Sequence, residues 1–268
     1  MLASLILAGI GMILKLAGGV LYGSRSVLID GATCIGNIAS GLLLYYSLHR
    51  ASLPPDEDHP YGHDRFIYAG VLGVLIVYSL IAGASTAVLY YSLGGYSVEA
   101  GAPIFALAGT LAYGLAVVAS RRVGYAGSVF SGFTLSEVLE GLVTSLSSYL
   151  GYEMGYYYDL AGGLVILGYL YYELYHEAKR LTILISDAID PGVTRRIRRL
   201  LEERGLRVEK IRLRLVTPGK YQGDAVVRAR MPYEVADLLA DEVVEEARRM
   251  GVDLVVHVDV EPARRGPR

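Results

Sequence analysis

The chain has 268 residues, 53% of them hydrophobic, and its 25 Lys and Arg nearly balance 27 Asp and Glu. This apolar fraction, gathered in long runs, is typical of a membrane protein and excludes an ordinary water-soluble domain. The net charge of −2 gives no reason to expect a nucleic-acid partner. The single cysteine, Cys34, excludes an intrachain disulfide and a multi-cysteine zinc cluster, so we expect metal ligands from His, Asp, Glu, Asn or Thr.

Six apolar segments predict transmembrane helices, near residues 1–22, 27–48, 66–93, 102–120, 132–151 and 159–177. Each has about the 20 residues that cross roughly 30 Å of hydrocarbon. The fifth is the weakest, because it carries Glu137 and Glu140. The sequence therefore predicts an all-α, six-helix transmembrane domain over residues 1–180.

After Pro191 the pattern becomes that of a water-soluble domain. It predicts a helix near 191–204, strands near 207–216 and 223–231, a helix near 233–250 and a strand near 252–260. This order suits a small α+β domain of ferredoxin-like fold over residues 181–268.

The distribution of basic residues predicts the orientation in the membrane. The loops after the second and fourth segments hold four arginines, and the loops on the other side hold only Arg25. The positive-inside rule then places both termini in the cytoplasm of a multi-pass plasma-membrane protein. The four arginines are Arg50, Arg65, Arg121 and Arg122.

The loop Pro55–Arg65 reads P-D-E-D-H-P-Y-G-H-D-R and is the most informative segment. Asp56, His59 and His63 offer a carboxylate and two imidazoles, which can hold a divalent transition metal. The alternative is a solvated polar loop whose charges only mark topology.

With this loop the chain resembles the cation diffusion facilitators, whose corresponding loop carries an acidic stretch followed by H-P-[FY]-G-H-x-[RK]. His59 through Arg65 match that motif, and the run Ser24 to Asp30 matches a second, S-x-x-L-x-x-D-like one. The resemblance implies a homodimeric transporter, not an enzyme, that exports zinc, manganese or iron(II) in exchange for protons. It also implies an ion held between the second and fifth helices by a His or Asp and an Asp four residues apart on each.

On the second helix these two positions fall on Thr33 and Asn37, which depart from the family pattern. Asp30, Thr33 and Asn37 share one helical face and still offer oxygen donors to a cation. The alternative is that Thr33 and Asn37 only bond a neighbouring helix, with Asp30 paired to Arg25 or Lys15.

On the fifth helix two registers stay open, Phe133 with Glu137 or Ser136 with Glu140. In both, a carboxylate lies within the membrane, where it costs several kcal/mol unless it faces a partner, a cavity or an ion. Because these donors are all oxygens, we expect a harder cation, such as manganese, iron(II), magnesium or calcium, to be preferred over zinc.

In the C-terminal domain, His257 and Asp259 alternate on the last strand and match two of the family's regulatory metal ligands. Glu209 and Arg228 stand where further histidines often occur, and an arginine cannot bind a cation. We therefore expect one weakly held ion there, or none.

Two other classes of protein have to be compared with these features. A transport-deficient relative with a regulatory or structural role is suggested by Thr33, Asn37 and Gly141 at ligand positions. An intramembrane hydrolase is excluded by the lack of a His-x-x-x-His, Asp-pair or Ser-Lys arrangement inside the predicted spans.

Overall fold

A computed structural model describes residues 2–120, 125–187, 189, 191–217 and 219–260. The chain forms two compact units. The first consists of Met1–Ser52 and Ala69–Lys179, and the second of Leu53–Tyr68 and Arg180–Arg268. The loop with the two histidines thus belongs to the same unit as the C-terminal strands.

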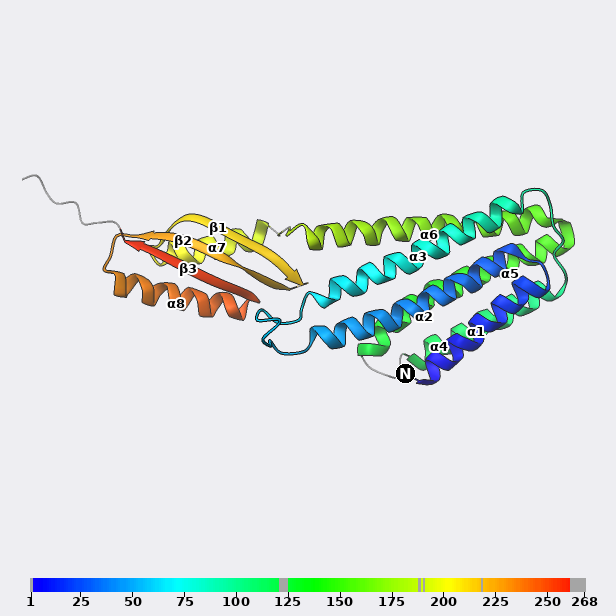
Figure 1. The fold of residues 1–268 in the computed structure, drawn as a ribbon, viewed down its shortest axis with the longest axis horizontal. Helices are drawn as coiled ribbons and strands as arrows, with labels where there is room; N and C mark the ends of the chain where they lie inside the picture. The colour runs from blue at the N-terminus through cyan, green and yellow to red at the C-terminus, as the bar shows by residue number, and fades with distance from the viewer. Residues whose placement is uncertain (1, 121–124, 188, 190, 218, 261–268) are drawn as a thin grey trace, which may run out of the picture. The chain divides into compact units, whose positions relative to one another are not determined.

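Six helices follow one another in the first part of the chain (Figure 1). They are α1 (Leu2–Leu21), α2 (Arg25–Ala51), α3 (Phe66–Tyr91), α4 (Gly101–Ser120), α5 (Tyr125–Met154) and α6 (Tyr156–Ile185). Within the described residues, four helices are long and apolar enough to cross a membrane, and these are α1 to α4. Helices α5 and α6 are longer, at 30 residues each, but they carry more acidic and polar side chains.

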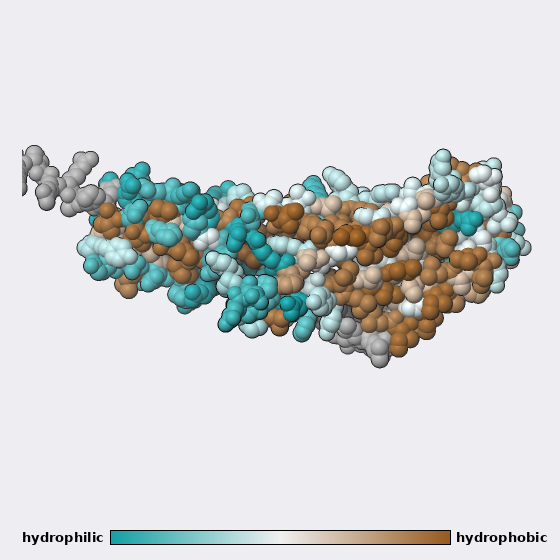
Figure 2. Space-filling model, viewed as in Figure 1, coloured by the Kyte–Doolittle hydropathy of each residue, from teal (hydrophilic) through white to brown (hydrophobic). Residues whose placement is uncertain are grey.

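The outer surface of the helices is largely apolar, as expected for a surface that faces lipid. Figure 2 shows apolar side chains spread over the helices of the first unit and mainly hydrophilic ones over the second. Leu80 of α3 and Leu111 of α4 are among the exposed large apolar residues. The first unit is therefore that of a membrane protein with several apolar helices.

The start of α2 is fixed by α6. Ser24 caps α2 by accepting a hydrogen bond from Val27 N, and its hydroxyl donates to Asp159 Oδ1 at 2.6 Å. The backbone N–H of Arg25 also donates to Asp159, at 2.7 Å. Gly19 of α1 lets α1 and α2 pack closely, because a Cβ at Gly19 would lie 2.5 Å from the Leu28 backbone of α2.

Apolar packing brings α2, α3 and α6 together. Ile29 of α2, Leu89 of α3 and Ile166 of α6 belong to one buried cluster. Helix α2 also packs against α5. Helix α2 therefore packs against α3, α5 and α6.

The second unit contains a three-stranded sheet with the order β1-β2-β3. Its elements are α7 (Pro191–Glu203), β1 (Arg207–Thr217), β2 (Lys220–Ala229), α8 (Tyr233–Arg249) and β3 (Val252–Val260). Strand β2 pairs antiparallel with β1 and parallel with β3. Ile197 of α7 and Val243 of α8 join Val227 in the core, and Figure 1 shows α8 along one face of the sheet.

The order helix, two strands, helix, strand agrees with the expectation from sequence. The second strand begins at Lys220 rather than near 223, because Lys220 and Tyr221 already pair with Thr217 and Leu215.

Candidate metal centre

The buried side chain of Glu137, on α5, is the centre of a polar cluster among the helices. Its exposed fraction is 0%. The Cys34 thiol donates to its Oε2 at 2.8 Å, and the Asn37 amide donates to its Oε1. Lys15 Nζ lies 3.5 Å from the same Oε2. Glu137 thus collects donors from both α1 and α2.

A second carboxylate, Glu140, lies one turn along α5 and faces α2 as well. Its Oε2 lies 3.2 Å from the Thr33 hydroxyl, which also reaches the carbonyl oxygen of Asp30 at 2.8 Å. The Asn37 carbonyl oxygen accepts a hydrogen bond from the Tyr78 hydroxyl of α3. Two side-chain hydrogen bonds therefore join α2 to α5, one between Thr33 and Glu140 and one between Asn37 and Glu137.

Asp30 and Lys15 form a fully buried ion pair, with 2.6 Å between Nζ and Oδ1. The Thr144 hydroxyl donates to the other oxygen of Asp30, also at 2.6 Å. The Lys15 ammonium lies 5.0 Å from the centroid of the Tyr113 ring. A positive charge of the protein itself thus lies beside Asp30 and Glu137.

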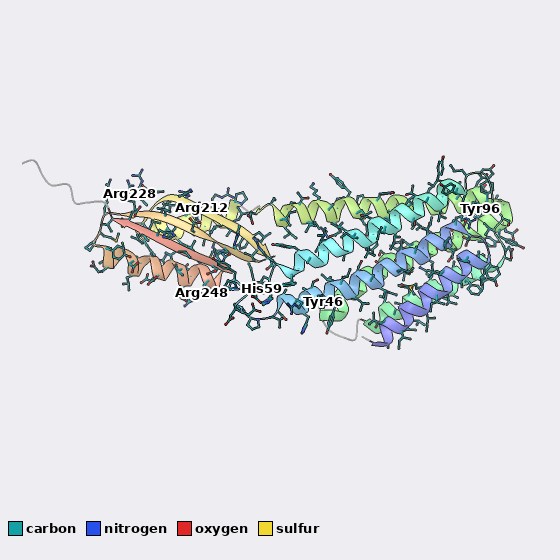
Figure 3. All side chains as sticks on the ribbon, in the orientation of Figure 1. Tyr46, His59, Tyr96, Arg212, Arg228 and Arg248 are labelled. Carbon is teal, nitrogen blue, oxygen red and sulfur yellow. The ribbon has the colours of Figure 1, made fainter. Side chains whose placement is uncertain are left out.

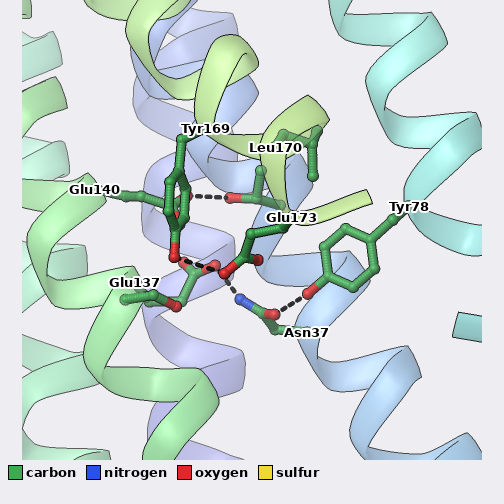
Figure 4. Close-up of a pocket in the computed structure, with 9 residues that line it drawn as sticks. Asn37, Tyr78, Glu137, Glu140, Tyr169, Leu170 and Glu173 are labelled. Atoms are coloured by element: carbon green, nitrogen blue, oxygen red, sulfur yellow. Dashed lines mark hydrogen bonds between the residues drawn. The ribbon is translucent and has the colours of Figure 1, made fainter. Parts of the chain in front are cut away.

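A cavity of about 10 Å³ opens beside Glu137 and Glu140 (Figure 4). That is close to the smallest space that holds one water-sized body. Figure 4 shows Tyr169 and Glu173 of α6 reaching the same place, with the Tyr169 hydroxyl donating to Glu173 Oε1 at 2.5 Å. The residues lining it are Thr33, Asn37, Tyr78, Ser136, Glu137, Glu140, Tyr169, Leu170 and Glu173.

The structure brings together five of the residues predicted from sequence. Asp30, Thr33, Asn37, Glu137 and Glu140 are all buried and linked by hydrogen bonds, directly or through Lys15. Of the two open registers, Ser136 lines the cavity, while the side chain of Phe133 lies outside the described residues.

Four residues at this site were not expected from the sequence. Tyr78, Tyr169 and Glu173 line the cavity, and Cys34, which is not among the predicted ligands, contacts Glu137. A signal existed for Glu173, because it is an ionisable residue inside the predicted sixth span. No such signal existed for the tyrosines, which the sequence uses widely.

The loop residues Asp56, His59 and His63 form a second cluster, in the other unit (Figure 3 labels His59). Asp56 Oδ1 lies 3.2 Å from His59 Nδ1, and Asp56 Oδ2 lies 3.2 Å from His63 Nε2. One ligand atom from each of the three residues lies within 4.8 Å of the others, so the three can hold one metal ion.

Local hydrogen bonds prepare these ligands. His63 Nδ1 lies 3.1 Å from the carbonyl oxygen of Pro54, which fixes the ring and leaves Nε2 for a metal. The backbone N–H of His59 donates to Asp56 at 2.8 Å and lowers the pKa of that carboxyl below its usual range. Asp56 therefore stays an anionic ligand to a lower pH than an ordinary aspartate.

The loop is tied to the strands of its own unit. Lys220 of β2 forms an ion pair with Asp64 at 2.8 Å, and the Tyr68 hydroxyl donates to the carbonyl oxygen of Val216. Arg65 lies 3.6 Å from Asp187, beyond the end of α6. The histidine loop and the sheet thus share direct contacts.

His257 and Asp259 lie on the exposed face of β3. Asp259 is opposite Arg228, whose guanidinium forms an ion pair with Glu209 at 2.8 Å (Figure 3 labels Arg228). Among the described residues, the two groups of three or more His, Cys, Asp or Glu that could hold a metal do not include His257 or Asp259.

These features define a helical membrane protein with a small, carboxylate-rich cavity among its helices. Residues 1–182 match the model of the cation efflux transmembrane domain. The chain therefore belongs to the cation efflux family, the cation diffusion facilitators, whose members are transporters and not enzymes.

Individual relatives agree with this assignment. An uncharacterized transporter of Methanocaldococcus jannaschii is 32% identical over 99 residues, which cover 35% of this chain and 32% of that protein. Metal tolerance protein C1 of Arabidopsis thaliana is 34% identical over 68 residues, 25% of this chain and 14% of that protein. The match thus spans a third or less of these two relatives. The manganese efflux system protein MneP of Bacillus subtilis is 22% identical over 230 residues, 78% of this chain and 77% of that protein.

Proposed function

We propose that this protein exports a divalent metal cation through a site formed by Thr33, Asn37, Glu137 and Glu140. The observation that carries the proposal is the small cavity at which these residues of α2 and α5 converge. Buried carboxylates inside a membrane domain are costly unless they face an ion, a partner or a cavity, and here they face a cavity.

The two units support an arrangement with six spans and both termini in the cytoplasm. Since the 53–68 loop and the C-terminal sheet form one compact unit, both lie on the same side of the membrane. The chain between them must then cross an even number of times. With α3 and α4 counted as spans, α5 and α6 must contribute either two crossings or none, and at about 1.5 Å per residue their 30 residues are long enough for both to cross, as this proposal requires. The positively charged loops support a cytoplasmic position for this side, and we propose the plasma membrane as the location.

A harder cation such as manganese or iron(II) suits the central site better than zinc. The cavity itself is lined by hydroxyl, amide and carboxylate groups. The sulfur of Cys34 lies on the side of Glu137 where Lys15 already supplies a positive charge. Efflux of manganese by MneP, as its name states, agrees with this preference. The same carboxylates support the proposed exchange for protons, because they can take up protons when the ion leaves.

The remaining parts have supporting roles in this proposal. Asp56, His59 and His63 bind zinc or a similar ion on the cytoplasmic side, and His257 with Asp259 holds at most one weak ion. The C-terminal unit, of ferredoxin-like type, has a thin core of its own and joins two copies into a homodimer.

Transport by the purified protein in proteoliposomes tests the central site. Uptake is compared for manganese, iron(II), magnesium, calcium and zinc, in the wild type and in the variants Asn37→Ala and Glu137→Gln. We expect manganese or iron(II) flux that both substitutions reduce at least tenfold. Zinc-selective flux that neither substitution changes would refute the site.

One observation favours the rival class, a transport-deficient relative. The Glu137 carboxylate already receives donors from Cys34 and Asn37 and lies near Lys15, so its oxygens are occupied by the protein. Absence of flux for every ion, in protein that folds and binds metal in its loop, would support this alternative.

A further inference from the structure

Helix α6 contributes a carboxylate to the cavity that the proposed site of α2 and α5 does not include. Glu173 lines the cavity together with Asn37, Glu137 and Glu140 (Figure 4). Its side chain is held by the Tyr169 hydroxyl, one turn earlier on the same helix, at 2.5 Å. This hydrogen bond holds the carboxylate in a defined place.

Glu173 adds a negative charge to the group of ionisable side chains around the cavity. Three carboxylates line the cavity, those of Glu137, Glu140 and Glu173, and the ion pair of Lys15 and Asp30 lies beside Glu137. One ammonium group and four carboxylates leave three net negative charges when all are ionised. A divalent cation reduces that charge to one, and Glu173 adds one of the negative charges that attract it.

Coordination chemistry points in the same direction. The Asn37 carbonyl oxygen is held by Tyr78, and the Glu137 oxygens receive bonds from Asn37 and Cys34. An ion in the cavity therefore needs further oxygens, and Glu173 supplies them from α6. Ions that take six or more oxygens gain from this addition, while tetrahedral zinc gains less.

We propose that Glu173, positioned by Tyr169, is a specificity-determining residue that completes the central site for a divalent cation of high coordination number, such as manganese. This inference rests on the proposed function of the cavity and names a third helix as a source of ligands. It also explains why a carboxylate is kept at this depth of α6.

The test measures metal binding by the full-length chain in detergent. All proteins carry His59→Ala and His63→Ala, so that the loop contributes no bound ion. Dissociation constants for manganese and for zinc are measured by calorimetry in this background and after adding Glu173→Gln. Glu177→Gln is the matched control, since it removes the same charge one turn along α6 at a residue that does not line the cavity. Glu173→Asp and Tyr169→Phe complete the set.

We expect Glu173→Gln to weaken manganese binding about tenfold or more and zinc binding clearly less. Glu173→Asp keeps the charge and should recover part of the loss, and Tyr169→Phe should fall between the parent and Glu173→Gln. Glu177→Gln should match the parent. Equal thermal melting of the variants shows that the fold is intact, and the ratio of manganese to zinc affinity separates a ligand from a structural residue.

The outcomes separate the role of Glu173 from that of the central site. If Glu173→Gln binds both ions like the parent while Glu137→Gln loses manganese, the role of Glu173 is wrong and the central site stands. If Glu137→Gln also leaves binding unchanged, the central site and the role of Glu173 are both refuted.

Discussion

Replacing Lys15 by methionine tests the electrostatic basis of the transmembrane unit. Both Lys15 and Asp30 have an exposed fraction of 0%, and their charged atoms are 2.6 Å apart. Removing one member of a buried pair leaves an uncompensated charge and costs about 3–5 kcal/mol. In Lys15→Met this cost appears in full. Among the described residues, the Asp30 side chain then keeps only the Thr144 hydroxyl as a partner, and Glu137 loses its nearby ammonium as well.

The opposite substitution should cost less. In Asp30→Asn, Lys15 still has the Glu137 carboxylate 3.5 Å away, so we expect a loss of about 1–3 kcal/mol, closer to that of a broken hydrogen bond. The double variant, with no charge at either position, should lose less than the two single variants combined. Reversible unfolding in mixed micelles measures these free energies. A change below about 1 kcal/mol for Lys15→Met, or strict additivity in the double variant, would refute the reasoning.

Three further predictions concern the loop, the assembly and the packing of the first helices. Metal bound at Asp56 should be lost in His59→Ala/His63→Ala, with the stoichiometry falling by one ion per chain in elemental analysis. In the wild type, metal binding should weaken as the pH falls below about 6.5, where free histidine becomes protonated, because metal ligands must be deprotonated. Asp56 stays anionic in that range, because its pKa is lowered. The purified protein should be a dimer in mild detergent at micromolar concentration, and a monomer in light scattering would contradict the proposed assembly. Gly19→Ala should lower the free energy of unfolding by about 1–3 kcal/mol, because a methyl group would meet the Leu28 backbone at 2.5 Å, and an unchanged stability would show that α1 shifts freely.

The helices and strands followed from local features of the sequence. Long apolar runs fix where helices such as α3 lie, and alternation of apolar residues fixes strands such as β3. The exact start of β2 could not be read, because Lys220 joins the sheet through pairing with Thr217, a contact that the local pattern does not encode. Likewise, the tie between the histidine loop and β2 through Asp64 and Lys220 joins residues 156 positions apart.

The central site could be predicted only as a set of candidates on two helices. Which residues face one another depends on how each helix is rotated about its axis, and a single sequence does not show that rotation. The structure pairs Thr33 with Glu140 and Asn37 with Glu137, a spacing of four on α2 against three on α5. This pairing suits antiparallel helices and differs from the four-residue spacing that the family pattern implies on both.

Two charged residues show how the cost of burial applies outside the ligand positions. A motif marks the ligands that relatives share, on α2 and α5, and so it leaves out Glu173, whereas the sequence already offered Lys15 as a partner for Asp30. The cost of a buried charge applies to every ionisable group inside a membrane domain, whether or not it belongs to a motif. Lys15 meets that cost through Asp30, and Glu173 through Tyr169 and the cavity. Because an ammonium group stands on one side of Glu137 and an additional carboxylate on the other, the cavity side is the more favourable place for a divalent cation.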